Sequence, residues 1–404
     1  MPKDRYRVLF IATHPIQYHA PIYRLMAQHP RLEMQAAYCS LQGAQAGLDP
    51  EFGVEVKWDV PLLQGYPWVQ VPNQSPRPGL GRFWGLINPG LWKMVSSGGY
   101  DAVVIYTGYA YLSFWIAMAA AKLHRIPILF GTDATGLEPR SQDHWKVWIK
   151  KLILPFIFRL ATVAIVPSAA SVEYLRSLRM PPDRIVMTPF AVDNDYWTSR
   201  AAKVDRTSVR RVWGVSDQQP VILFCAKLQP WKRPQDVLRA LAKAGVPDAI
   251  LVMAGEGPLR AALEAEARTL EIADRVRFLG FVNQPDLPAL YRAADMMVLS
   301  SEYDACPVVV CEAMLCGCPT ILSDKIRGRL ELVRPGQTGF IYPCGNIDAL
   351  AEALRAALAD RQKLKQMGRA AEKVMETWSP RENVQAHVQA IEKAVLTVQK
   401  GAAH

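Results

Sequence analysis

Apolar runs of strand length alternate with helix-period segments along almost the whole chain. The runs in the first half are VLFIAT, MQAAYC, AVVIY, PILFGT and VAIVPS, and those in the second half are VILFCA, AILVMAG, VRFLGFV, MMVLSS, PTILSD and GFIYP. Many are continuously apolar, which is typical of parallel strands buried on both faces. Their alternation with helices predicts βαβ units, and the two successive series predict an α/β chain with two Rossmann-like sheets.

The polar, weakly periodic segment 190–219 separates the two series of strands. Because domains commonly hold about 100–200 residues, two domains are expected for this length. We predict an N-terminal Rossmann-like domain over 1–200 and a second domain over 201–375. The remaining segment, 376–404, is predicted to be a helix that packs back toward the N-terminal domain.

One segment has the length of a membrane span, because no charge lies between Asp101 and Lys122. Its character changes midway, from the strand-like AVVIY through TGY to the helix-like AYLSFWIAMAAAK. We therefore expect a buried strand followed by a packing helix. The first apolar run, Val8 to Ala12, is too short for a signal peptide, so a cytoplasmic protein with reduced cysteines is expected.

The net charge of +10 fits a phosphorylated ligand, an anionic membrane or nucleic acid. No arm of consecutive Lys and Arg is present, which counts against nucleic acid. The segment SQDHWKVWIKKLILPFIFRLA places basic residues beside Trp and Phe, as helices at membrane surfaces do. An anionic membrane is therefore a candidate partner, with peripheral attachment at the inner face. An ordinary helix of the N-terminal domain is the alternative.

Four of the seven cysteines fall within SEYDACPVVVCEAMLCGCPTILSD. Pro307 suits the start of a helix and Gly317 its end. Cys306 and Cys316 would then lie about 15 Å apart, at about 1.5 Å per residue. Zinc ligands lie within about 2.3 Å of the metal, so these two thiols cannot share one ion. We expect the cysteines to pack as small apolar side chains, and we predict no metal site.

Candidate charged groups lie next to the strands of the second series. Asp304 comes just before the predicted helix, whose N-terminus suits a phosphate, and Glu312 lies eight positions later on the helix. Lys227 and Lys232 follow VILFCA, at the strand end where ligands of open α/β sheets bind. Two lysines there would neutralise a diphosphate, and a carboxylate would accept hydrogen bonds from vicinal hydroxyls. Solvated surface charges are the alternative for all four.

The stretch MAGEGPLRAALEAEA is predicted as a strand, a tight turn and a helix. Gly255 and Gly257 in this turn would allow a ligand to approach the backbone closely. The third glycine of the dinucleotide-binding fingerprint is missing, which counts against a dehydrogenase.

Taken together, the order and spacing of these motifs resemble the donor-binding domain of GT-B glycosyltransferases of family 4, also called glycosyl transferases group 1. The match covers about residues 220–345. AKLQPWKRP is similar to that family's G-R-L-x-x-x-K-G, and Asp304-ACPVVVC-Glu312 to its pair of glutamates seven residues apart, with Asp for the first Glu. The resemblance implies a GT-B fold, with two Rossmann-like domains facing each other across a cleft.

By this resemblance, Lys227 and Lys232 would hold the donor diphosphate and Glu312 the ribose hydroxyls. Asp304 would face the transferred sugar, and Glu302 is the alternative for this first carboxylate. The other donor-binding positions are Gly255, Glu256, Gly257, Pro258, Phe281, Val282, Cys306, Pro307 and Val308.

The N-terminal half is less similar to the family. In THPIQYHAP, His14, Gln17 and His19 are candidates for the acceptor side, and Asp133 follows the strand in FGTDATG. Capping and packing are the alternatives for His14, and they are favoured for His19. The D-x-D sequence at 193–195 lies in the hinge, so a metal role is not expected there.

The resemblance implies a retaining glycosyltransferase that needs neither metal nor cofactor. Its donor would be a UDP-, GDP- or ADP-sugar, and its acceptor a glycan or a lipid-linked sugar. Two alternatives stay open: a nucleotide-sugar 2-epimerase of the same fold, and a protein that binds a nucleotide sugar without turnover.

Overall fold

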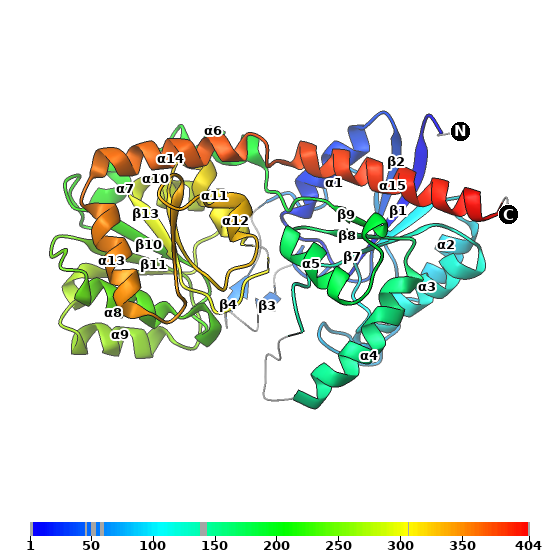
Figure 1. Ribbon diagram of the computed structural model, residues 1–404, viewed down its shortest axis with the longest axis horizontal. Helices are drawn as coiled ribbons and strands as arrows, with labels where there is room; N and C mark the ends of the chain where they lie inside the picture. The colour runs from blue at the N-terminus through cyan, green and yellow to red at the C-terminus, as the bar shows by residue number, and fades with distance from the viewer. Residues whose placement is uncertain are drawn as a thin grey trace. The chain divides into compact units, whose positions relative to one another are not determined.

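The computed structural model describes residues 3–44, 47–49, 54–56, 60–137, 144–305 and 307–402. The chain forms two compact units (Figure 1). Unit 1 consists of Met1–Gln45, Pro61–Phe190 and Pro380–His404, and unit 2 of Ala46–Val60 and Ala191–Ser379. Each apolar run that predicts a strand forms one, and these strands lie in two parallel sheets. The expectation of two parallel α/β sheets is therefore confirmed.

Unit 1 is built on a seven-stranded sheet in which every neighbouring pair is parallel. In spatial order its strands are β5 (Trp68–Gln70), β2 (Leu32–Tyr38), β1 (Tyr6–Ala12), β6 (Ala102–Ile105), β7 (Ile128–Gly131), β8 (Val163–Val166) and β9 (Ile185–Met187). The edge strands β5 and β9 are absent from the sequence prediction. Each has only three residues, and these are partly exposed, so neither gives a long apolar run.

Helices cover both faces of this sheet (Figure 1). They are α1 (His19–Gln28), α2 (Gly90–Ser97), α3 (Leu112–Leu123), α4 (His144–Leu160), α5 (Ala169–Ser177) and α15 (Pro380–Ala402), with 3-10 turns at Phe83–Gly85 and Pro182–Arg184. In β1, Tyr6, Val8 and Phe10 pack with α1 and α15, whereas Leu9 and Ile11 pack with α2, α3 and α4. This division follows from the two-residue period of a strand.

The uncharged segment between Asp101 and Lys122 is divided between β6 and α3. All four side chains of β6 are buried, as are Phe114, Ala117 and Met118 of α3. The expected buried strand and packing helix are thus confirmed. Among the described residues, no helix combines the length and the apolar character needed to cross a membrane.

Unit 2 contains a six-stranded parallel sheet. In spatial order its strands are β12 (Val276–Gly280), β11 (Ile250–Ala254), β10 (Val221–Cys225), β13 (Met296–Leu299), β14 (Thr320–Ser323) and β15 (Gly339–Tyr342). Its α-helices are α6 (Asn194–Ala201), α7 (Arg206–Val212), α8 (Pro234–Lys243), α9 (Arg260–Thr269), α10 (Leu287–Ala293), α11 (Val308–Leu315), α12 (Arg329–Leu332), α13 (Ile347–Leu358) and α14 (Arg361–Met375). Two 3-10 turns, Pro230–Lys232 and Ala273–Arg275, and an antiparallel hairpin of β3 (Gly47–Asp49) and β4 (Val54–Val56) complete it.

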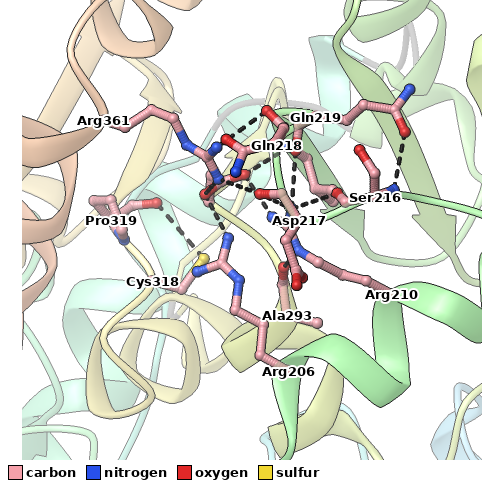
Figure 2. A network of polar contacts seen from close by, with 12 residues as sticks. Arg206, Arg210, Ser216, Asp217, Gln218, Gln219, Ala293, Cys318, Pro319 and Arg361 are labelled. Atoms are coloured by element: carbon pink, nitrogen blue, oxygen red, sulfur yellow. Dashed lines mark hydrogen bonds and ion pairs between the residues drawn. The ribbon is translucent and has the colours of Figure 1, made fainter.

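A buried carboxylate joins the amino ends of two central strands of unit 2. Asp295, which directly precedes β13, accepts a hydrogen bond from the backbone N–H of Val221, the first residue of β10, at 2.8 Å. The guanidinium groups of Arg206, Arg210 and Arg361 (labelled in Figure 2) lie 2.5, 2.6 and 3.4 Å from the Asp295 carboxylate. Burial raises the pKa of Asp295, but Arg206 and Arg210 outweigh this effect and hold the pKa below its usual value. The first turns of α7 and α14 are thereby fixed to the sheet.

Two histidines of unit 1, the buried His387 of α15 and the half-buried His19 of α1, lie close to Tyr106. His387 Nδ1 lies 2.9 Å from the Asn383 carbonyl oxygen, so Nδ1 carries the proton and Nε2 accepts from the Tyr106 hydroxyl at 2.5 Å. The His19 ring contacts the Tyr106 ring at a centroid distance of 5.1 Å. Burial lowers the pKa of His387 to about 4 and that of His19 to about 3. The ring contact with Tyr106 is in keeping with the packing alternative for His19.

We predict that the protein loses stability as the pH falls from the ordinary histidine pKa of 6.5 toward about 4. In this range the imidazole of His387 binds a proton in the unfolded chain but stays neutral in the folded protein. The free energy of unfolding therefore rises with pH, and the contribution of His387 reaches its full value above pH 6.5. His387 alone would contribute about 3 kcal/mol, at about 1.4 kcal/mol per pKa unit. Urea unfolding at a series of pH values measures this, and His387→Gln should flatten the acid side of the curve. The exposed His124→Gln is the control, and an unchanged slope in His387→Gln would contradict the prediction.

Candidate functional site

The carboxyl ends of β10 and β13 form the switch point of the unit 2 sheet. The chain adds β11 and β12 on one side of β10 and then places β13 on the other side. Loops that leave adjacent strands in opposite directions create a crevice, and open α/β sheets bind their ligands there. Lys227 and Lys232 follow β10, and Asp304 follows β13. Three of the predicted catalytic residues therefore belong to the loops at this point.

The turn after β11 is held against the loop after β10. The backbone φ angles of Gly255 and Gly257, 149° and 153°, lie in the region that favours glycine. A Cβ atom at Gly255 would lie 2.0 Å from the Ala226 carbonyl oxygen, so no other residue fits there without a shift of the backbone. The N–H of Leu228 donates to the Glu256 carbonyl oxygen at 2.9 Å. These contacts fix the backbone on either side of Lys227.

Lys232 and Asp304 form an ion pair across the switch point. Lys232 Nζ lies 2.6 Å from Asp304 Oδ2, and the two side chains are 18% and 14% exposed. The Asp304 backbone is held as well, because its carbonyl oxygen accepts from the N–H of Arg327 at 2.8 Å. The structure therefore brings the predicted lysine and the predicted carboxylate into direct contact.

Glu302, the alternative to Asp304, is bound by a different cation. Arg233 Nη1 donates to Glu302 Oε1 at 2.6 Å, while the same guanidinium binds the buried carboxylate of Asp236 through Nε at 2.6 Å and Nη2 at 3.1 Å. These carboxylates, Asp236 first, raise the pKa of Arg233 despite its partial burial. Arg233 has a left-handed backbone with φ of 49°, directly after Lys232. The geometry thus pairs Lys232 with Asp304 and leaves Glu302 to Arg233.

Glu312 is buried on α11, and its carboxylate accepts from the Tyr291 hydroxyl of α10 at 2.8 Å. Burial raises the pKa of Glu312 to about 7, against the hydrogen bond from Tyr291, which lowers it. A solvated helix face, the alternative considered for this residue, is therefore excluded. A buried carboxylate with a pKa raised this far can change its charge in response to a ligand.

The predicted base-binding positions lie around β12. Phe281 and Val282 directly follow this strand and are half-buried. Glu256 Oε1 pairs with Arg260 Nη1 at 2.9 Å, and the guanidinium of Arg260 lies over the Phe278 ring at 4.7 Å from its centroid. Glu256 is therefore held by a salt bridge to an arginine that itself contacts an aromatic ring of β12.

The helix start predicted at Pro307 is confirmed, since Pro307 precedes the first helical residue, Val308. Cys306 lies outside the described residues. Burial raises the pKa of Cys311 and of Cys316, which ends the helix, so both stay protonated thiols. Among the residues that the structure describes, no group of three His, Cys, Asp or Glu side chains is arranged to hold a metal ion.

The unit 1 candidates also follow strands at their carboxyl ends. His14 comes after β1, where its Nδ1 lies 3.0 Å from the Thr13 hydroxyl and burial lowers the pKa of its ring. Gln17 is half-buried in the segment that leads into α1. Asp133 is exposed two residues after β7. The D-x-D sequence has a local role, since the Asp193 side chain accepts from the backbone N–H of Tyr196 and caps α6.

Two residues of this site are absent from the sequence prediction. Tyr291 lies within YRAAD, and only the packing of α10 on α11 shows that its hydroxyl reaches Glu312. Arg233 follows Lys232 directly in AKLQPWKRP, so its charge is visible in the sequence. Its left-handed backbone and its two carboxylate partners are not.

Two protein-family models match the chain. The model "Glycosyl transferase 4-like domain" matches residues 22–191, and the model "Glycosyl transferases group 1" matches residues 205–374. The chain is 32% identical over 263 residues to N-acetyl-alpha-D-glucosaminyl L-malate synthase of Bacillus anthracis, which covers 64% of this chain and 65% of that protein. It is 34% identical over 194 residues to D-inositol 3-phosphate glycosyltransferase of Geodermatophilus obscurus, which covers 45% of this chain and 42% of that protein. The match spans less than two thirds of either relative.

Solved structures share the fold over nearly the whole chain. HepE of Anabaena, in complex with UDP and glucose, superposes with a TM-score of 0.72 at 20% identity and covers 95% of this chain and 99% of that one. A glycosyltransferase from Rickettsia africae gives 0.74 at 16% identity, with 98% and 99% covered. Sucrose-phosphate synthase from Thermosynechococcus elongatus gives 0.69 at 18% identity, with 99% and 100% covered.

Proposed function

This chain belongs to the glycosyl transferases group 1 family and has the GT-B fold, and from that premise we propose that it is a retaining hexosyltransferase. It moves a sugar from a nucleotide-sugar donor to a glycan or a lipid-linked acceptor. The observation that carries this proposal is the contact of Lys232 with Asp304 at the switch point of unit 2, with Lys227 on the same loop.

Lys227 and Lys232 are proposed to hold the donor diphosphate. Breaking a sugar–phosphate bond places negative charge on the departing diphosphate, and cations fixed in advance at that position stabilise it. The N-terminus of α11 adds the partial positive charge and free N–H groups of a helix start. Because these groups belong to the chain, charge stabilisation needs no metal ion or cofactor. The UDP in the HepE structure supports a UDP-sugar among the UDP-, GDP- and ADP-sugar candidates.

Asp304 is proposed to bind hydroxyl groups of the transferred sugar, and Glu312 the ribose hydroxyls. Asp304 is a methylene shorter than the Glu expected at its position, but the pairing of Glu302 with Arg233 supports Asp304 in this role. Gly255, Gly257, Pro258, Phe281 and Val282 would border the base.

The bond to the leaving diphosphate and the new bond to the acceptor would lie on the same face of the transferred sugar. In such a front-face reaction the leaving phosphate helps to deprotonate the acceptor hydroxyl, so no protein nucleophile is needed. His14, Gln17 and Asp133 of unit 1 are proposed to contact the acceptor. A nucleotide-sugar 2-epimerase would convert the donor without an acceptor, and a binding protein would leave it intact.

We further propose that α4 attaches the protein to an anionic membrane surface, which suits a cytoplasmic enzyme with a lipid-linked acceptor. Its exposed apolar side chains recur at helical spacing and include Trp148, Leu152 and Phe156, which are 65%, 51% and 68% exposed. Lys150 and Lys151 are exposed on the same helix. Burial of the apolar side chains in lipid and attraction of the lysines to anionic head groups support the same partner.

The donor site is tested with Lys227→Ala and Lys232→Ala. Nucleotide sugars are first screened for a rise in melting temperature, since a ligand that binds only the folded state stabilises it. Transfer and hydrolysis of the stabilising sugar are then measured. Each variant should lose transfer by orders of magnitude while it keeps its fold, because a cation on the leaving group is lost. Lys243→Ala, which breaks an exposed ion pair with Asp348, is the matched control. Transfer within a few-fold of wild type in both site variants would refute the proposed diphosphate role.

The assignment of the first carboxylate is tested by Asp304→Asn and Glu302→Gln. Asp304→Asn should lower transfer by roughly 10- to 100-fold, because a hydrogen bond to a charged group contributes about 1.5–3 kcal/mol. Glu302→Gln should stay within about threefold of wild type, since its exposed pair with Arg233 contributes about 1 kcal/mol or less. Initial rates with the donor found above decide this, and the reverse order of effects would assign the role to Glu302.

Membrane attachment is tested by flotation with liposomes that contain phosphatidylglycerol. Wild-type protein should float with these vesicles, and the double variant Trp148→Ser/Phe156→Ser should stay in the dense fraction. Val212→Ser, which removes an 85% exposed apolar side chain of unit 2, is the control and should float. Wild-type protein that does not float would contradict the proposal.

A further inference from the structure

Tyr291 and Glu312 form a buried hydrogen-bonded pair at the site proposed for the donor ribose. Tyr291 is fully buried, Glu312 is 7% exposed, and the hydroxyl oxygen lies 2.8 Å from Glu312 Oε2. We propose that Tyr291 is a positioning residue that favours the ionised form of Glu312 and orients it to accept hydrogen bonds from the ribose hydroxyls. This inference rests on the proposed function, which places the ribose at Glu312.

The single proton of the Tyr291 hydroxyl goes to the carboxylate. Two acceptors lie within reach, Glu312 Oε2 at 2.8 Å and Cys225 Sγ at 3.6 Å. A carboxylate is the stronger acceptor, and the thiol can in turn donate its own proton to the phenol oxygen. Burial raises the pKa of both Tyr291 and Cys225, so both stay protonated. The three side chains thus form a chain of hydrogen bonds that ends on Glu312.

The ring of Tyr291 is held independently of its hydroxyl. Trp197 of α6 is fully buried and contacts the Tyr291 ring at a centroid distance of 5.9 Å, tilted by 60°. Contacts of α10 with α6, α7 and α11 surround the helix that carries Tyr291. Replacement by Phe therefore keeps the packing and removes only the hydrogen bond.

The hydrogen bond opposes the effect of burial on Glu312. Burial raises the pKa of Glu312 to about 7, and the hydrogen bond from Tyr291 lowers it. Among the residues that the structure describes, the titratable groups that interact electrostatically with Glu312 include Tyr291 of α10, Cys225 of β10, Tyr196 of α6, and Cys311 and Cys316 of its own helix. Without the Tyr291 hydroxyl the pKa of Glu312 would be higher still, and more of the carboxyl would be protonated at neutral pH.

An ionised carboxylate is the form that suits two vicinal hydroxyls. It has about four acceptor positions on its two oxygens, of which Tyr291 uses one on Oε2. Oε1 and the rest of Oε2 are left for the ribose. Protonation would turn one oxygen into a donor. Affinity for a ribose-containing diphosphate should therefore rise with pH through the pKa of Glu312.

The experiment follows the charge of Glu312 and the binding of nucleotide separately. The infrared band of the protonated Glu312 carboxyl, identified by subtraction of the Glu312→Gln spectrum, is titrated in wild type and in Tyr291→Phe without ligand. Its midpoint should move up by about one pH unit or more, as expected for the loss of a hydrogen bond to a charged group. Tyr342→Phe, which removes another buried hydroxyl of unit 2, should leave it unchanged.

Calorimetric titrations with UDP, GDP and ADP across the same pH range measure the affinity for nucleotide. For the diphosphate that binds best, Tyr291→Phe should weaken affinity about fivefold or more near neutral pH and recover wild-type affinity at alkaline pH. The 2′,3′-dideoxy form of the same diphosphate should show no difference between the two proteins.

The infrared titration and the binding titration test different parts of the proposal. An infrared midpoint that is the same in wild type and Tyr291→Phe would overturn the positioning role of Tyr291. Equal loss of affinity for the dideoxy diphosphate would overturn the ribose contact of Glu312. If none of the three diphosphates binds the wild-type protein, the proposed donor site itself is refuted and the ribose contact falls with it, while the infrared titration still decides whether Tyr291 sets the charge of Glu312.

Discussion

The buried carboxylate of Asp295 is the constraint on which the geometry of unit 2 depends. It binds the first N–H of β10 and directly precedes β13, so it fixes the relative position of these two strands at their amino ends. The resulting register pairs Ile222 with Met296, and both strands run from there to their carboxyl ends. There the same strands end in the loops of Lys232 and Asp304. The fixed register of these strands places the two loops so that Lys232 and Asp304 form their ion pair of 2.6 Å.

Burial of Asp295 would be unfavourable without its three arginines. Burial of an unpaired carboxylate costs much free energy. A buried carboxylate is tolerated when cations and N–H groups satisfy its oxygens. Arg210, itself fully buried, also donates to the carbonyl oxygens of Ala293, Ser216 and Gln219. The arginines labelled in Figure 2 thus hold the amino ends of β10 and β13 together. The charged side chains of Lys232 and Asp304, at the carboxyl ends of the same strands, are partly exposed and remain accessible to a ligand.

The features that the sequence predicts correctly are those set by local residue patterns. Continuous apolar runs mark β10 and β13, because both faces of these strands are buried, and the lysines and Asp304 follow from their places at strand ends. The short strands β5 and β9 have no such run. The bond from Tyr291 to Glu312 joins two helices, and the pairing of Glu302 with Arg233 joins two loops that lie far apart in the sequence. Such partners are set by tertiary packing, and a single sequence does not show them.

The contact of Lys232 with Asp304 has a consequence for the proposed reaction. Both side chains are partly exposed, so their mutual attraction is worth only about 1 kcal/mol and is easily replaced. A diphosphate carries more charge than one carboxylate and would draw Lys232 toward it. Asp304 would then lose its cation at the moment when a sugar arrives beside it, and hydroxyl groups of that sugar would satisfy the freed oxygens. The pair thus satisfies both charges before a donor binds. On binding, Lys232 would turn to the diphosphate of the donor and Asp304 to its sugar.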